Sequence, residues 1–75
     1  MEEVRTILEG LFPDVDFEKE THLVEDRILR SFDVIAITRE LCEHFDIEIE
    51  AVDLVPENFN SLAAISAMVE RKEDE

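Results

Sequence analysis

The amino-acid sequence predicts an all-α domain with three longer helices and one short helix. Apolar residues recur at helical spacing in three stretches, residues 2–12, 31–45 and 61–71. Helix breakers are rare, since the 75 residues include 1 Gly and 2 Pro. Residues 46–52 alternate charged and β-branched side chains as a strand does, but no second stretch of this kind can pair with them. We therefore expect a four-helix bundle in which residues 46–52 form an extended loop.

The first helix, residues 2–12, is followed by a long acidic connection, residues 13–30. Gly10 and Pro13 mark the end of the helix. Its apolar stripe consists of Val4, Ile7, Leu8 and Leu11. A connection this long in a small domain is usually functional. Its apolar residues follow no regular period, and we expect them to fasten it to the core: Val15, Phe17, Leu23, Val24, Ile28 and Leu29.

The second helix, residues 31–45, shows the clearest division into an apolar face and a polar face. Ser31 is expected to be its N-cap, with Asp33 in the first turn. Phe32 is the exception, because it lies on the polar side above Ala36. The apolar face, with Ile35 at its edge, consists of Val34, Ile37, Thr38, Leu41, Cys42 and Phe45. The polar face consists of Asp33, Ala36, Arg39, Glu40, Glu43 and His44.

Two more helices are expected towards the C-terminus. Residues 56–59 suit a short helical turn, because Pro56 would stand at its first position. Asn60 or Ser61 caps the last helix, residues 61–71. The side chains that face inward on this helix are Leu62, Ile65, Met68 and Val69.

The length and composition predict a single domain, residues 1–75, and a monomer. A chain of this size buries only about 60% of its unfolded surface, so its stability is marginal. No apolar run reaches the length of a signal peptide or a membrane span, and the N-terminus is acidic. The single cysteine, Cys42, excludes an internal disulfide. These features favour a cytoplasmic protein that does not insert into membranes.

The charge of the chain indicates which partners it can bind. With 21 acidic and 7 basic side chains, the formal net charge is −14. Such an excess repels the phosphates of nucleic acids and of anionic lipids, so we expect neither as a partner. The stretch from Asp33 to Glu57 holds eight of the acids and one base, Arg39. This concentration predicts docking to partner proteins with basic surfaces.

Two patterns that could indicate catalysis or metal binding are weak. Asp14, Asp16, Glu18, Glu20 and Glu25 stand at ligand positions of a twelve-residue EF-hand loop, but Lys19 replaces the glycine that its sharp turn needs. Cys42 and His44 are two residues apart on a helix, where side chains do not face each other. His22 has no metal-ligand partner at a suitable spacing. We expect no catalytic residues, no metal ligands and no enzymatic activity.

Ser31 is the residue that carries the functional hypothesis. A serine at the start of a helix usually serves only as a cap. Here the serine ends a long connection and precedes an outward-facing Phe32, so its hydroxyl is expected to be accessible. A phosphate on this hydroxyl would meet the positive end of the helix dipole. The position therefore suits a covalent phosphodiester tether.

The sequence around Ser31 resembles the attachment region of acyl and peptidyl carrier proteins. The similar stretch is Leu23-Val24-Glu25-Asp26-Arg27-Ile28-Leu29-Arg30-Ser31-Phe32-Asp33-Val34-Ile35. The stretches Phe45-Asp46-Ile47-Glu48-Ile49 and Asn58-Phe59-Asn60-Ser61-Leu62-Ala63-Ala64-Ile65 resemble later parts of the same family. The likeness covers nearly the whole chain and is nearest to small stand-alone carriers of the D-alanyl carrier kind. It implies the acyl-carrier type of four-helix bundle.

In this family, the serine of an Asp-Ser-Leu motif receives 4′-phosphopantetheine from coenzyme A. The resemblance implies that Ser31 bears this arm, whose thiol carries an acyl group as a thioester. Phe32 replaces the motif leucine, and Asp33 matches the acid that commonly follows. Arg30 replaces the motif aspartate, and Arg27 stands where such loops often have glycine. Ala36 stands where many carriers have glutamate.

The resemblance also implies a set of partner enzymes. These are a phosphopantetheinyl transferase, an acyl- or aminoacyl-activating ligase, and acyl-transfer or condensing enzymes, in fatty acid, polyketide, peptide or D-alanyl transfer. The alternative is an unmodified carrier-like helical interaction module, which Arg27 and Arg30 favour. The residues expected to contact partners are Glu25, Asp26, Arg30, Phe32, Asp33, Ala36, Arg39, Glu40 and Glu43.

Overall fold

Four α-helices and one 3₁₀ turn make up residues 2–75, the part of the chain that the computed structural model describes. No strand occurs within this range, so the predicted all-helical class is confirmed. Three helices are longer and one is short, as expected. The elements are α1 (Glu2–Leu11), α2 (Ser31–Phe45), the 3₁₀ turn η1 (Ala51–Asp53), α3 (Pro56–Phe59) and α4 (Leu62–Glu73).

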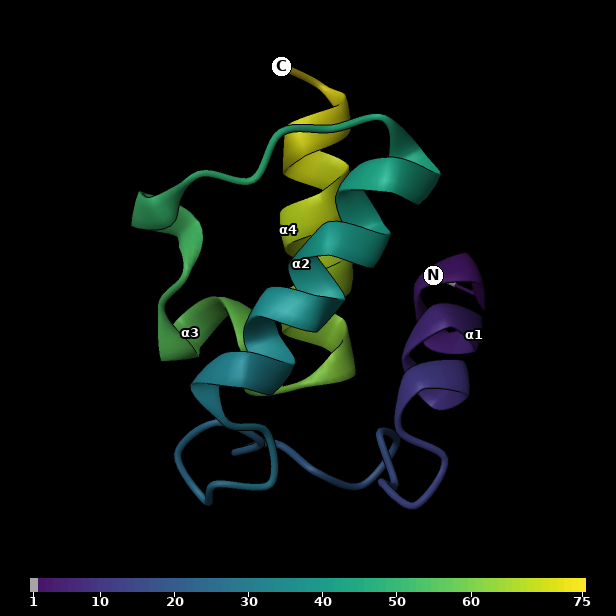
Figure 1. The fold of residues 1–75 in the computed structure, drawn as a ribbon, viewed down its shortest axis with the longest axis vertical. Coiled ribbons are helices and arrows are strands. Elements are labelled where there is room, and N and C mark those ends of the chain that lie inside the picture. The colour runs from purple at the N-terminus through teal and green to yellow at the C-terminus, as the bar shows by residue number, and fades with distance from the viewer. Residues whose placement is uncertain (1) are drawn as a thin grey trace.

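The helices pack around α4. The contacts between helices join α1 to α2, both of these to α4, and α3 to α4. Figure 1 shows α2 in front of α4, with α1 at one side and α3 at the other. The connection from α1 to α2 crosses the lower end of the bundle, and the connection from α2 to α3 starts at the upper end and descends along one side. None of the helices within residues 2–75 has the length and apolar character needed to cross a bilayer.

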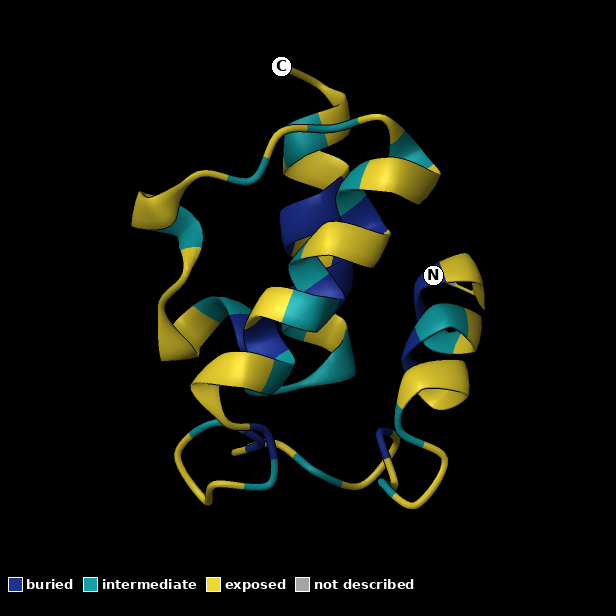
Figure 2. Cartoon of the chain, viewed as in Figure 1, coloured by how far each residue is buried: buried dark blue, intermediate teal, exposed yellow. Residues whose placement is uncertain are grey.

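The core draws on all four helices and on the long connection between α1 and α2. In Figure 2 the buried segments face the middle of the bundle, while the connection is mostly exposed and buried only at separate points. Those points are Phe17, Leu23 and Leu29, which confirms that apolar residues fasten the connection to the core. The buried apolar residues of the helices are Val4, Leu8, Val34, Ile37, Leu41, Phe59, Ile65, Met68 and Val69.

The start of α2 differs from the prediction in one respect. Ser31 is the first helical residue, and Arg30 occupies the N-cap position. Asp33 causes the difference, because its Oδ2 accepts a hydrogen bond of 3.0 Å from the backbone N–H of Arg30. The expected capping role of Ser31 is therefore wrong, and its hydroxyl is not engaged in holding the helix end.

The other local predictions are settled by specific hydrogen bonds. Ser61 caps α4, since its Oγ accepts from the N–H of Ala64 at 3.0 Å. The extended loop expected over residues 46–52 is correct up to Glu50 and wrong beyond it. There the backbone N–H of Asp53 donates to the backbone oxygen of Glu50 at 2.9 Å and closes the 3₁₀ turn η1. The N–H of Glu50 donates to Oδ2 of Asp53, also at 2.9 Å, and caps the turn.

Asp53 fastens the connection between α2 and α3 to the last turns of α4. Nζ of Lys72 lies 2.8 Å from Oδ2 of Asp53, and both side chains are largely shielded from solvent. The backbone oxygen of Asp53 accepts from Nδ2 of Asn58 at 2.8 Å. Oδ1 of Asn58 in turn accepts from Nη2 of Arg71 at 3.1 Å. These contacts hold the segment that leads into α3 in one position.

The Asp53–Lys72 pair makes the stability depend on pH. The hydrogen bond from Lys72, followed by the one from the Glu50 N–H, holds the pKa of Asp53 below its ordinary value of 3.8. The same pair raises the pKa of Lys72 above 10.5. The contribution of Asp53 is therefore present above pH 3.8 and is lost as the pH falls through its lowered pKa. The contribution of Lys72 is present below pH 10.5 and is lost as the pH rises through its raised pKa.

We expect Lys72→Met to lower the free energy of unfolding most at neutral pH. The difference from wild type should shrink at strongly acidic pH, where Asp53 is protonated, and at strongly alkaline pH, where Lys72 is deprotonated, because the wild-type pair then lacks one of its charges. Urea unfolding across the pH range measures this difference. Lys19→Met, at an exposed base, is the control and should track the wild type. A Lys72→Met difference that stays constant with pH would show that the contact is not ionic.

Candidate functional site

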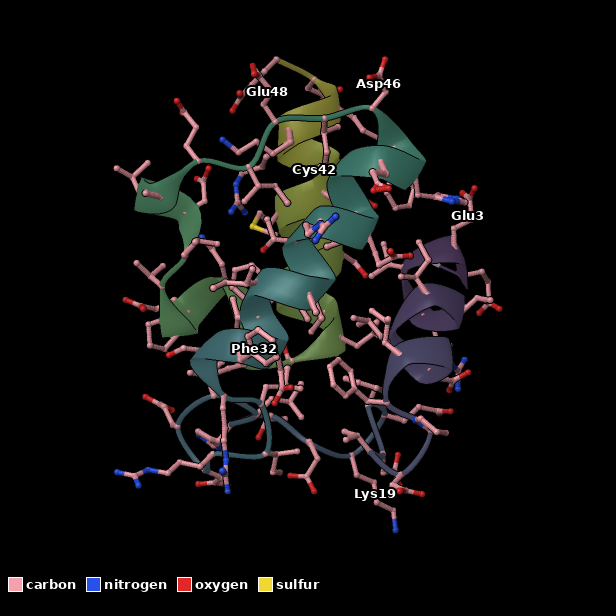
Figure 3. The ribbon with its side chains drawn as sticks, in the orientation of Figure 1. Glu3, Lys19, Phe32, Cys42, Asp46 and Glu48 are labelled. Carbon is pink, nitrogen blue, oxygen red and sulfur yellow. The ribbon has the colours of Figure 1, made fainter. Side chains whose placement is uncertain are left out.

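Ser31 stands at the start of α2, where the long connection from α1 ends. The residue is exposed, and within residues 2–75 its hydroxyl makes no hydrogen bond. Phe32 follows it and is 82% exposed. Figure 3 shows the Phe32 ring on the first turn of α2, on the face turned away from α4. The predicted accessibility of the hydroxyl and the outward position of Phe32 are both confirmed.

An apolar groove of about 360 Å³ opens beside Ser31. Ser31 supplies the only polar side chain of its lining. One wall comes from α2 and the opposite wall from the segment that enters α3, so residues far apart in the sequence meet here. The apolar lining residues are Val24, Val34, Ile35, Leu54, Val55, Pro56 and Phe59.

A second hollow, of about 470 Å³, also reaches Ser31. Its lining residues include Arg27 and Arg30, together with Val24 and Leu29. Both arginines are exposed. Ser31 thus belongs to two hollows of different character, one apolar and one cationic. No carboxylate or histidine side chain lines either of them among the residues that the structure describes.

Asn60 holds the end of the long connection in place, a role that the sequence analysis missed. Its Oδ1 accepts from the N–H of Val24 at 3.0 Å and from the N–H of Glu25 at 3.2 Å. Its backbone oxygen accepts from the N–H of Leu23 at 2.9 Å. These bonds anchor the segment that lines both hollows. The only sequence signal was an asparagine beside a helix cap, which does not reveal partners 35 and 36 residues away.

Arg27 adopts the left-handed backbone conformation, with φ of 61°. Its N–H donates to the backbone oxygen of Val24 at 3.0 Å, which closes a turn just before Ser31. A side chain with a β-carbon is strained in this conformation, whereas glycine is not. The backbone at this position therefore favours glycine, and the arginine is held there at a cost in strain.

We expect Arg27→Gly to raise the free energy of unfolding by about 0.5–1 kcal/mol, because relief of the strain exceeds the added entropy of the unfolded chain. Arg27→Ala keeps the β-carbon and is the matched control, with an expected change within about 0.5 kcal/mol. Chemical unfolding of the three proteins measures both effects. Equal stabilities of the Gly and Ala variants would contradict a backbone origin.

The residues expected to contact partners lie around Ser31 and along α2. Two of them, Asp33 and Ala36, are half-buried, and Asp33 is engaged with the backbone of Arg30. Asp33 and Ala36 therefore border the exposed residues of this group and are only partly open to a partner. The exposed members are Glu25, Asp26, Arg30, Phe32, Arg39, Glu40 and Glu43.

Two of the EF-hand-like residues, Asp16 and Glu18, are engaged in contacts with other parts of the chain. Oδ1 of Asp16 accepts from the N–H of Glu18 at 3.1 Å, and the Glu18 carboxylate pairs with Arg5. Lys19 lies at the outer end of the connection (Figure 3). Within residues 2–75 no three His, Cys, Asp or Glu side chains come together as a possible metal site.

Cys42 and His44 have separate surroundings in the structure. Cys42 is half-buried on α2. Nε2 of His44 lies 3.6 Å from Oε2 of Glu3 on α1. The ring of His44 also meets Phe45 edge-on, with centroids 4.7 Å apart. These contacts are structural and do not bring the thiol and the imidazole together.

Chemically, the site offers an accessible hydroxyl between an apolar groove and a cationic hollow. The lining supplies no side chain that could act as its general base. Such an arrangement can hold a group attached to the hydroxyl, but it does not activate the hydroxyl itself. Comparison of the chain with protein-family models, curated proteins and solved structures finds no match.

Proposed function

We propose that this chain is a carrier protein of the acyl and peptidyl carrier type, which bears 4′-phosphopantetheine on Ser31. The observation that carries the proposal is the free, exposed hydroxyl of Ser31 at the first residue of α2, beside an apolar groove. A long connection before this helix and a short third helix agree with the bundle that the resemblance implies. The role of the chain is to carry and present an acyl group to other enzymes.

The residues around Ser31 fit such an arm. Its hydroxyl is free to form the phosphodiester, and the groove offers apolar surface from Ile35, Leu54 and Val55 to the part beyond the phosphate. The arm, when bound, supplies a thiol that carries the acyl group as a thioester. Because the lining has no general base, attachment depends on a separate transferase, which agrees with a carrier rather than an enzyme.

The exposed face of α2 suits the partners of a carrier. Glu40 and Glu43 are exposed there, and Phe32 adds an exposed apolar ring at the Ser31 end. Acids around an apolar contact favour fast, charge-steered association with basic partner surfaces. The proposed partners are a phosphopantetheinyl transferase, an acyl- or aminoacyl-activating ligase, and acyl-transfer or condensing enzymes. We further propose that the protein works in the cytoplasm as a monomer.

Incubation with coenzyme A and a broad-specificity phosphopantetheinyl transferase tests the proposal. We expect the intact mass to increase by one phosphopantetheinyl group, and Ser31→Ala to abolish this increase. Ser66→Ala is the matched control and should be modified like wild type, because the Ser66 hydroxyl is buried without a hydrogen-bond partner. Tryptic peptides of the product should place the group on Ser31.

The alternative is an unmodified helical interaction module. Arg27 and Arg30 favour it, because they make the surroundings of Ser31 cationic and thus unlike those of the acidic carriers that the chain resembles. Failure of wild type to gain mass, under conditions that load a control carrier, would decide for this module and against the carrier.

A further inference from the structure

Arg27 and Arg30 line the same hollow as Ser31 and have no ionic partner within residues 2–75. Lys19, Arg39 and Arg71 likewise form no ion pair there, so the distinguishing feature of Arg27 and Arg30 is their place beside Ser31. Arg5 and Lys72, by contrast, each contact more than one carboxylate. Three carboxylates stand within four residues of these arginines in the sequence, but none forms an ion pair with either arginine: Glu25, Asp26 and Asp33.

Each of the two arginines also stands where arginine is unfavourable for local structure. Arg27 has a φ of 61°, in the region that favours glycine. Arg30 is the N-cap of α2, at the positive end of the helix dipole, where a cation is repelled. Asp33, which could offset that charge, is hydrogen-bonded to the backbone of Arg30 and forms no ion pair with its guanidinium. Departures from local rules are expected where a side chain has a function.

A phosphoester is the ligand that two such groups beside a hydroxyl would take. Guanidinium groups donate pairs of N–H bonds that match the geometry of phosphate oxygens. A phosphorus atom bonded to Oγ of Ser31 would carry its free oxygens into the neighbourhood of this hollow. We propose that Arg27 and Arg30 together hold the phosphate of a phosphoester formed on Ser31, which deepens the proposed function and rests on it. They offset the repulsion that the nearby carboxylates exert on this phosphate.

The test uses the full chain synthesised with phosphoserine at position 31, and therefore needs no transferase. The second pKa of a free phosphoserine is about 6. We expect this pKa to be lower by about one unit in the otherwise wild-type chain, because a nearby cation favours the dianion. Titration followed by ³¹P NMR measures it. The phosphoserine chain carrying Arg27→Gln and Arg30→Gln should show a pKa about one unit higher than that of the otherwise wild-type chain, because the two cations are gone while the dipole of α2 and the nearby carboxylates remain. Those carboxylates are Glu25, Asp26 and Asp33, with Glu57 on the neighbouring α3.

Lys19→Gln provides the matched control, because Lys19 is an exposed base that lines neither hollow. It should leave the lowered pKa unchanged. A pKa that is equal in the wild-type and double-variant backgrounds would overturn the proposal. Circular dichroism of all three chains verifies that they are folded. Because the phosphate is built in, a lowered pKa supports the two arginines even where coenzyme A fails to modify Ser31, and that failure counts only against the carrier function.

Discussion

Phe59→Ala should lower the free energy of unfolding by about 3–5 kcal/mol. Phe59 is the largest fully buried side chain, so its truncation leaves a cavity that the short helix α3 cannot close. Domains hold only about 0.05–0.15 kcal/mol of stability per residue, so this loss takes most of what a small chain has. Urea unfolding followed by circular dichroism at the helix signal measures the change.

Val52→Ala is the control for this experiment. Val52 is 79% exposed, and its truncation is expected to change the free energy of unfolding by less than about 0.5 kcal/mol. If the two variants unfolded at the same urea concentration, Phe59 could not be a central core residue. Because Phe59 also lines the apolar groove, its loss should alter that groove in any fraction that stays folded.

Asn60→Ala is expected to destabilise the protein by about 1–3 kcal/mol, because two backbone N–H groups lose their acceptor. Those groups belong to Val24 and Glu25, which precede Ser31 in the connection. The effect should be local as well as global. Amide hydrogen exchange of Val24 and Glu25 should become faster than that of the buried amides of α2, and urea unfolding gives the overall loss.

Asn60→Asp separates the hydrogen bonds from the rest of the side chain. Aspartate keeps an oxygen where Oδ1 accepts from the two N–H groups, so most of the stability and of the exchange protection should return. If the aspartate variant were as unstable as the alanine variant, the bonds to Val24 and Glu25 would not be the cause.

The helices could be predicted from the sequence because their apolar spacing is a local property. The second helix has its predicted bounds, and the others end within two residues of them. The start of α2 was harder to predict in detail. Whether Ser31 or Arg30 caps it depends on the carboxylate of Asp33 reaching back to one N–H, and propensities alone favour the serine.

The candidate site was predictable only in part. Ser31 and Phe32 stand in a local motif, so their exposure followed from helical geometry. The groove did not, because Leu54 and Val55 reach it only when the segment before α3 is fastened to α4. The apolar residues of the long connection follow no regular period, because Phe17 and Leu23 enter the core at separate points. Asn60 was missed for a related reason, since its partners lie on a distant segment.

Ser31 stands where an apolar surface meets a cationic one, and this boundary has a consequence for anything attached to its oxygen. In a substituent with an anionic end and a hydrocarbon end, the anionic end would lie at the cationic surface and the hydrocarbon end at the apolar one. Solvation, rather than a single directional bond, would then set its orientation, since apolar burial is non-directional. Such an arrangement tolerates hydrocarbon portions of different length and shape, while the anchored end stays in the same position.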